Sequence, residues 1–417
     1  MAYSTRGSSV KKDAYIKRLA PTYLSADRRY IAEWNAHLYS LYQSYGEASK
    51  RKQFITEPYV MKYLQNVLQR ILDSNHIRQK IEVVPTRYAE PNAYNMGDNR
   101  LFVNIGVLGL LDNEAQLAFL LCHELSHQLL HHVQEKFSAH RALAADKAVK
   151  KEMRDIRAAK YNKLDRSAQF AMKYSYTFAA YSRAKEHAAD SMAIVLLQKS
   201  TYDIHEGEEL LEILKRSDTD STHIDYTRFL GSTATPLRRD VLQDSRYAIS
   251  FGGKRAIAYE EDSIKSHPDI PQRKAFISAV PGRTGGEKFV VSRPAFDSIK
   301  AAAAYEIIES FDANDRYAAG VYHTLSLLQH NPRNSYLVRK AAFGLRDIVV
   351  AVRDHDIQNH VPIESDANSP AYNQLLRIID RTTFDELKAL YFTFLDRYSE
   401  QLTAYPELRK IDEKAKS

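Results

Sequence analysis

Two histidines spaced one helical turn apart are the residues of this chain best suited to chemistry. Residues His123 to His127 read HELSH and match the pattern H-E-x-x-H, within a helix that we predict from 112 to about 134. Residues four apart share one helix face, so both imidazoles can reach one metal ion, and Glu124 beside them can activate water. The alternative is two surface histidines on an ordinary helix. The apolar flanks on both sides favour a buried helix, and buried polar side chains need partners.

A metal site of this kind needs a third protein ligand, because catalytic zinc takes three protein ligands and keeps one position open. One class of zinc peptidase uses a third histidine six residues after the second, and Val133 stands at that position here. Another class uses a glutamate from a later helix. Glu186 and Asp190 share one face of a helix that we predict from 167 to 198. Glu186 can ligate the metal and Asp190 can hydrogen-bond a ligating histidine; the alternative is a solvated acidic pair.

Five short segments occur in an order typical of one peptidase family. Together they resemble the HtpX-type zinc metallopeptidases, a gluzincin family that includes the CaaX prenyl proteases and the Oma-type and BepA-type peptidases. The resemblance covers roughly residues 57 to 280, and His132 also stands where the family often carries a histidine. Without the membrane-spanning helices of HtpX, the chain resembles the soluble branch, which often has a helical C-terminal domain. The segments are NAY at 92–94, LFVNIG at 101–106, EAQLA at 114–118, HELSH at 123–127 and EHAAD at 186–190.

The resemblance assigns a role to individual residues. His123, His127 and Glu186 would bind one zinc ion per chain, with Asp190 supporting a ligating histidine. Glu124 would be the general base that activates water and then passes the proton to the leaving amine. The implied activity is that of a zinc metalloendopeptidase that hydrolyses peptide bonds of unfolded or misassembled proteins, as in protein quality control.

Three further features extend the resemblance to the catalytic chemistry. Arg273 would stabilise the oxyanion of the tetrahedral intermediate, or else form a structural salt bridge. His267, in the segment Ser266-His267-Pro268, would do the same or would occupy the open zinc position and hold the enzyme latent; the alternative is a loop turn. The strand that we predict over Leu101–Ile105 would pair with an extended substrate as an edge strand, and the alternative is a core strand.

The elements that must position these residues divide the chain into three predicted parts. Residues 1–56 form an N-terminal leader and helices, 57–285 the metallopeptidase domain with a small sheet, and 286–417 a C-terminal helical domain. The fold class is α+β, mostly α. The pattern around Asn331-Pro332 resembles one tetratricopeptide-type hairpin. A chaperone-like or adaptor protein, with a latent or vestigial metal site and a protein partner on the C-terminal helices, is therefore the alternative function.

Composition and charge restrict the partners. Of the 417 residues, 44% are hydrophobic and 27% charged, as in globular proteins, and the single Cys122 excludes a scaffold of internal disulfides. The net charge of +7 is mild for this length, and no nucleic-acid partner is expected. The basic excess lies in Lys136–Lys185, with 13 basic and 4 acidic residues, where we predict a helix from 137 to about 161. This stretch is a solvated face or contacts an anionic membrane surface or an acidic partner.

The sequence shows neither an export signal nor an apolar run long enough to span a bilayer. The branch that the chain resembles implies a periplasmic or cell-envelope location. The alternative is the cytoplasm.

Overall fold

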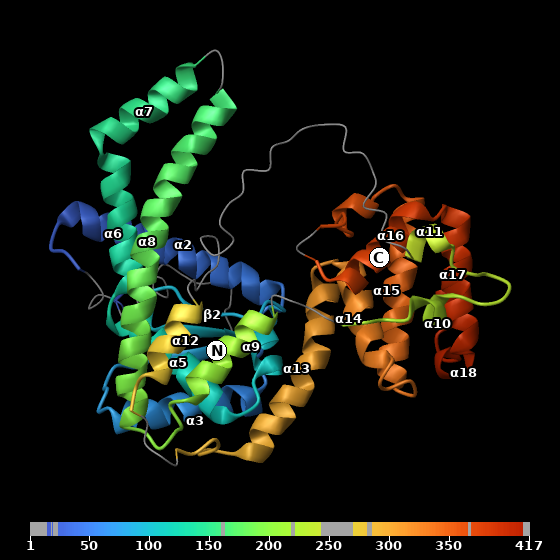
Figure 1. Ribbon diagram of the computed structural model, residues 1–417, viewed down its shortest axis with the longest axis horizontal. Coiled ribbons are helices and arrows are strands. Elements are labelled where there is room, and N and C mark those ends of the chain that lie inside the picture. Colours follow the sequence, from blue (N-terminus) through green and yellow to red (C-terminus); the bar gives the residue numbers. More distant parts are fainter. Residues whose placement is uncertain are drawn as a thin grey trace. The chain divides into compact units, whose positions relative to one another are not determined.

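A computed structural model describes residues 15–17, 19, 24–159, 163–217, 222–242, 270–281, 286–365 and 368–411 of the chain (Figure 1). The chain forms two compact units. One comprises Met1–Lys215 and Arg255–Ala302, and the other comprises Arg216–Lys254 and Ala303–Ser417. The predicted three-part division at residues 57 and 286 stays a prediction. Residues 216–254 belong to the same unit as the C-terminal helices.

The first unit is mostly helical and contains a small sheet, as predicted for the α+β class. Its described elements are α2 (Arg28–Lys50), α3 (Pro58–Ser74), β1 (Glu82–Thr86), β2 (Ala93–Asn95), β3 (Arg100–Asn104), α4 (Ile105–Leu110), α5 (Glu114–Leu129), α6 (His132–Ala145), α7 (Lys147–Ala158), α8 (Lys163–Gln198), α9 (Glu206–Ser217), α12 (Ile270–Ser278) and the first part of α13 (Arg293–Ala313). Among the described residues, no helix combines the length and apolar character needed to cross a membrane.

The strand order of the sheet corrects one prediction. The order is β1-β3-β2, with β1 parallel and β2 antiparallel to β3. The predicted edge strand Leu101–Ile105 is therefore wrong, because β3 lies in the centre, is buried along its whole length and has a strand on each side. Ile105 already begins α4. The edge strand that packs against α5 is β2.

Helix α5 is enclosed by the rest of its unit, with every residue from Glu114 to Gln128 buried. It begins at Asn113, whose side chain accepts a hydrogen bond from the backbone N–H of Gln116. The predicted helix from 112 to about 134 is interrupted, because His131 adopts the left-handed conformation at φ 57° and the chain turns into α6. The buried part of the predicted helix is therefore shorter and carries the whole H-E-x-x-H segment.

The basic stretch forms two helices where one was predicted from 137 to about 161. Asp146 lies between α6 and α7 in an extended conformation, and its carboxylate accepts hydrogen bonds from the backbone N–H groups of Ala148 and Val149. This is the geometry of a helix N-cap, so α7 begins anew at Lys147. The long helix α8 follows and returns to the centre of the unit beside α5.

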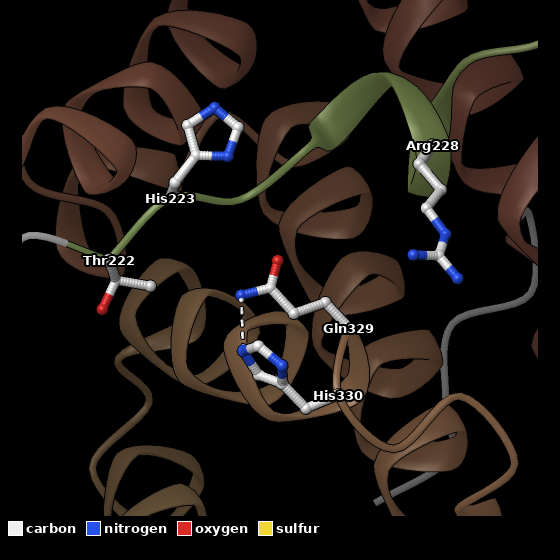
Figure 2. A pocket seen from close by; sticks show the side chains of 5 residues that line it. All are labelled: Thr222, His223, Arg228, Gln329 and His330. Atoms are coloured by element: carbon white, nitrogen blue, oxygen red, sulfur yellow. Dashed lines mark hydrogen bonds between the residues drawn. The ribbon is translucent and has the colours of Figure 1, made fainter.

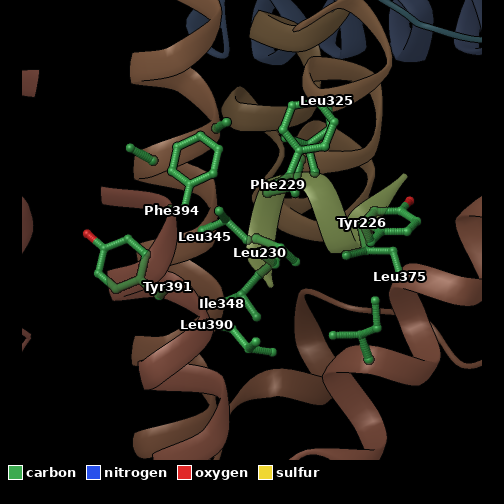
Figure 3. Packing of buried hydrophobic residues seen from close by; sticks show 14 of the residues in the cluster. Tyr226, Phe229, Leu230, Leu325, Leu345, Ile348, Leu375, Leu390, Tyr391 and Phe394 are labelled. Atoms are coloured by element: carbon green, nitrogen blue, oxygen red, sulfur yellow. The ribbon is translucent and has the colours of Figure 1, made fainter. Parts of the chain in front are cut away.

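The second unit is helical around one apolar core. Its described elements are α10 (Tyr226–Leu230), α11 (Arg239–Leu242), the last part of α13, α14 (Tyr317–Leu328), α15 (Ser335–Arg353), η3 (Ile357–Asn359), α16 (Pro370–Arg381), α17 (Phe384–Arg397), α18 (Ser399–Leu402) and η4 (Pro406–Arg409). Phe229, Leu325, Leu345 and Phe394, from four different helices, meet in this core (Figure 3). The α14–α15 hairpin surrounds Asn331-Pro332 as the sequence suggested, and the tetratricopeptide likeness stays a prediction.

Candidate metal centre

Two buried helices bring three potential ligands to one point. His123 and His127 extend from α5, and Glu186 extends from α8. The Nε2 atoms of the two histidines lie 3.1 Å apart. The carboxylate oxygens of Glu186 lie 3.3 Å from Nε2 of His123 and 3.4 Å from Nε2 of His127. Glu186 thus lies within reach of the histidine pair, as the sequence predicted.

These spacings fit a tetrahedral metal ion. Zinc lies about 2.0–2.1 Å from an imidazole nitrogen or a carboxylate oxygen, so neighbouring ligand atoms of a tetrahedron are about 3.3 Å apart. The three measured separations, 3.1, 3.3 and 3.4 Å, lie close to that value. Two imidazole nitrogens and a carboxylate, all buried, could therefore hold one metal ion and leave a fourth position for another ligand.

Asp190 fixes the orientation of His123. Its Oδ1 atom lies 2.9 Å from Nδ1 of His123, and the role of His123 as a metal ligand stays a prediction. A donor at Nδ1 leaves Nε2 to face the metal position. Burial raises the pKa of the Asp190 carboxyl, but hydrogen bonds from Arg273 and His123 outweigh it and lower the pKa well below its usual value. Asp190 is therefore ionised and accepts these bonds.

Arg273, on α12, is buried and forms ion pairs with two carboxylates. It donates to Asp190 through Nε at 2.7 Å and Nη2 at 2.8 Å, and its Nη1 lies 3.3 Å from Glu186. The sequence left two roles open for Arg273, stabilising the oxyanion or forming a structural salt bridge. These contacts are those of a salt bridge, and the oxyanion role stays a prediction. The single positive charge of the guanidinium offsets part of the cost of burying two carboxylates.

The same carboxylates act on His123 itself. Burial lowers the pKa of His123, but its hydrogen bonds with Asp190 and Glu186 outweigh burial and raise the pKa to about 9. The negative charge around this imidazole therefore favours a cation at its position. A proton can satisfy that preference, and so can a metal ion at Nε2.

His132 is a site residue to which the sequence assigned no role. Its Nδ1 lies 2.7 Å from Nδ1 of His127. Burial, and then the nearby Lys185, lower the pKa of His132 to about 4, so its ring is neutral near pH 7 and can accept the Nδ1 proton of His127. This contact orients His127 as Asp190 orients His123. The family position of His132 was the only available signal, because the contact depends on the turn at His131.

Glu124 lies on the same buried helix, next to His123. The side-chain amide of Asn95 donates a 3.0 Å hydrogen bond to the backbone carbonyl of Glu124, which ties the edge strand β2 to α5 at this residue. Ser266, His267 and Pro268 lie outside the described residues, so the predicted role of His267 stays a prediction.

Comparison with known proteins places the whole site within one family. The sequence matches peptidase family M48 over residues 58–280, which contain His123, His127, Glu186 and Arg273. The chain belongs to peptidase family M48. This M48 chain is also 26% identical over 151 residues to the mitochondrial metalloendopeptidase OMA1 of Schizosaccharomyces pombe. The alignment covers 36% of this chain and 42% of the relative, so the chain matches less than half the length of that protein.

The second unit contains a hollow of about 500 Å³, which Figure 2 shows from close by. His223, Arg228 and His330, which line it, are exposed, and Gln329 Nε2 lies 3.3 Å from His330 Nε2. Exposed cationic and imidazole groups around an open hollow remain solvated. Among the described residues, the candidate metal ligands therefore lie in the first unit.

Proposed function

We propose that this M48 chain is a zinc-dependent endopeptidase. The observation that supports the proposal is the convergence of His123, His127 and Glu186 at tetrahedral ligand spacings, inside the segment that matches a peptidase family. Two imidazoles and one carboxylate form the ligand set typical of catalytic zinc in peptidases.

The chemistry divides between the metal and the chain. A bound zinc ion supplies a Lewis acid that polarises a peptide carbonyl and lowers the pKa of water. Glu124 takes the proton of the attacking water and returns it to the leaving amine. Asp190 and His132 hold the two histidines by their Nδ1 atoms, and Arg273 balances the charge of the carboxylates.

An extended substrate would pair with β2, because this edge of the sheet lies beside α5. The opposite edge is already covered by the chain's own groups. Gln65 accepts from the backbone N–H of Val83 at 3.1 Å and donates to the carbonyl of Ile81 at 3.0 Å, while the N–H of Ile55 donates to the carbonyl of Pro85. Backbone pairing along β2 selects extended segments with little sequence preference, which suits unfolded or misassembled proteins.

The Glu124→Gln variant tests this mechanism. We expect cleavage of an unfolded protein such as casein to fall by about 10²–10⁴-fold, because the general base is lost. The zinc content should stay at one ion per chain, measured by elemental analysis. The matched control is Glu90→Gln, at an exposed position outside the site, which should cleave at the parent rate. Equal activity of Glu124→Gln and the parent would falsify the mechanism.

The alternative function is that of a chaperone-like or adaptor protein with a vestigial site. The separate apolar core of the second unit favours a domain that can act on its own. Elemental analysis of metal-replete protein distinguishes the two. An empty site in such a preparation supports the adaptor, and a stoichiometric zinc ion with cleavage that needs Glu124 supports the peptidase.

We further propose a location in the cell envelope, on the basis of the branch that the chain resembles. Fractionation of cells that produce the untagged chain tests this location. Recovery with cytoplasmic markers alone would contradict it.

A further inference from the structure

A helical arm joins the two ligand-bearing helices of the first unit. It consists of α6, α7 and the part of α8 that precedes Glu186, and α7 with the start of α8 extends away from the rest of the unit (Figure 1). Helix α8 is continuous from Lys163 to Gln198, so the start of the helix lies about 35 Å along its axis from Glu186. At the base of the arm, Lys185 of α8 forms an ion pair with Glu135 of α6.

One face of α7 consists of cations only. Five basic side chains fall within an arc of about 120° when successive residues are placed 100° apart around the helix. All five are exposed, and the described residues give none of them an ion-pair partner. We call this face the basic stripe; its members are Lys147, Lys150, Lys151, Arg154 and Arg157.

The opposite face of α7 is already used for packing. Val149 and Ile156 are 6% and 8% exposed, and α7 packs against α6 and α8. The acidic residues Glu152 and Asp155 lie outside the arc of the basic stripe. The helix is therefore held by its apolar face and presents its positive charge outward.

The charge of the arm differs from that of the rest of the chain. Lys136–Lys185 carries an excess of nine positive charges, whereas the whole chain carries +7, so the remainder is slightly negative. A solvated helix face needs no such separation of charge. The separation therefore points to a negatively charged partner for the arm.

We propose that the basic stripe binds an anionic lipid membrane surface. Clusters of four to eight lysines and arginines on one face of a helix adsorb to anionic headgroups, each contributing roughly a fivefold gain in affinity. The arm projects from its unit, so a broad, flat surface can reach all five cations at once. Adsorption would hold the metal centre about 35 Å from the lipid, measured along α8.

The composition of the stripe disfavours other anionic partners. A protein interface has an apolar, usually aromatic centre. Met153, at 39% exposed, is the only large apolar side chain of α7 that is exposed. Sequence-specific nucleic-acid binding uses amide and other polar side chains beside arginine to read base edges, and the stripe carries only lysine and arginine. A lipid surface requires neither feature.

Vesicle co-sedimentation of the full chain tests the proposal without any use of peptidase activity. The vesicles contain phosphatidylcholine with phosphatidylserine as the anionic lipid, and vesicles of phosphatidylcholine alone serve as the neutral comparison. We expect binding only to the anionic vesicles, with affinity falling as salt is added. The triple variant Lys150→Gln, Lys151→Gln, Arg154→Gln should lose on the order of a hundredfold in affinity.

The matched control removes the same charge elsewhere in the same unit. Lys62→Gln, Arg78→Gln, Lys80→Gln changes three exposed cations outside the arm, and we expect it to lower affinity by no more than about threefold through net charge alone. Circular dichroism of both variants should match the parent, since all six side chains are exposed.

Three results would overturn the proposal. The first is absence of binding to anionic vesicles at low salt. The second is an equal loss of affinity in the two triple variants, which would show that only net charge matters. The third is tighter binding of the parent to duplex DNA or to polyglutamate than to the vesicles, which would assign the stripe to a nucleic acid or to an acidic polypeptide.

Discussion

Helix α5 of the first unit and helices α14 and α15 of the second all contribute to a buried interior, but α5 buries many more polar and ionisable side chains. Beside its apolar residues, helix α5 buries two histidines, two glutamates, the side-chain amides of Gln116 and Gln128 and the hydroxyl of Ser126. Helices α14 and α15 bury mainly alanine, leucine, valine and isoleucine (Figure 3). The second unit is therefore stabilised mainly by apolar burial, and the first unit depends in addition on hydrogen bonds and ion pairs among its buried polar groups.

The pairing in the metal unit is extensive and long-range. Glu114, at the start of α5, accepts hydrogen bonds from the hydroxyls of Tyr63 and Tyr202 and from the backbone N–H groups of residues 290–292. Glu206 accepts from Asn113 and Gln116 in the same way. These contacts hold helix α5 from several directions. A buried polar helix of this kind is expected where function requires charge in the interior.

The largest difference in stability between the two units should appear when the charge of Arg273 is removed. Arg273→Met leaves the buried carboxylates of Asp190 and Glu186 with His123 as their remaining cationic partner, and we expect the metal-free chain to lose about 3–5 kcal/mol of unfolding free energy in urea. Added zinc should restore part of the loss, because it supplies positive charge at Glu186. The surface counterpart Arg238→Met, in the second unit, should change stability by less than about 1 kcal/mol. Similar losses in both variants would contradict the comparison.

An apolar truncation in the second unit should behave differently toward metal. Leu325 is fully buried in the core of that unit, so Leu325→Ala should cost about 2–5 kcal/mol through lost transfer energy and the cavity that remains. Zinc should not restore this stability, because the core contains no ligand. Urea unfolding with and without zinc measures the effect, and a metal-dependent rescue would show that the two units are energetically coupled.

His132 offers a smaller and more local test. His132→Ala removes the group that holds Nδ1 of His127, so we expect zinc affinity to fall by about 10–100-fold while the metal-free stability changes little. Competition with a zinc chelator measures the affinity. The matched control His205→Ala, whose imidazole lies 3.1 Å from the Glu208 carboxylate outside the metal centre, should bind zinc like the parent. Unchanged affinity in His132→Ala would remove it from the site.

The smallest effect should come from Asp347 in the second unit. Burial raises the pKa of its carboxyl to about 6 in the folded chain, above the usual 3.8. Stability is therefore lost as pH rises from about 4 through 6, where the folded carboxyl must ionise. Asp347→Asn should unfold about 1 kcal/mol less readily than the parent at pH 7, and the gain should vanish near pH 4.

Substitution of Asp356 should change stability at neutral pH in the opposite direction. Hydrogen bonds from His360 and Asn359 lower the pKa of its carboxyl, so its ionised form favours the folded state. Asp356→Asn should therefore reduce stability at neutral pH and lose its effect in acid. Urea unfolding at pH 7 and pH 4 measures both variants. If both substitutions changed stability at pH 7 in the same direction, burial of Asp347 and hydrogen bonding of Asp356 would not explain their effects.

The local sequence pattern was sufficient to predict features that lie within a single helix. The helix predicted from 167 to 198 is observed as α8 at Lys163–Gln198. The H-E-x-x-H spacing placed His123 and His127 on one helix face, because helical periodicity is a property of the backbone. The continuous helices predicted from 112 to about 134 and from 137 to about 161 were wrong at His131 and Asp146, because each break depends on a single residue whose conformation or side chain ends a helix.

Long-range pairing was accessible only from the tertiary structure. Periodicity cannot distinguish a central strand from an edge strand, so β3 was assigned to the wrong position in the sheet. Nor could spacing show that the turn at His131 brings the imidazole of His132 against His127, or that Arg273 is occupied by Asp190 and Glu186.

The sequence by itself determined which side chains are available for metal chemistry and which helix faces carry them, because neighbours along the chain set local geometry. Only the tertiary structure decided which of them meet. His123 and Asp190 stand 67 residues apart, and their contact depends on how α8 packs against α5 after the arm has returned. Packing between distant surfaces is a property of the whole fold, and no local spacing encodes it.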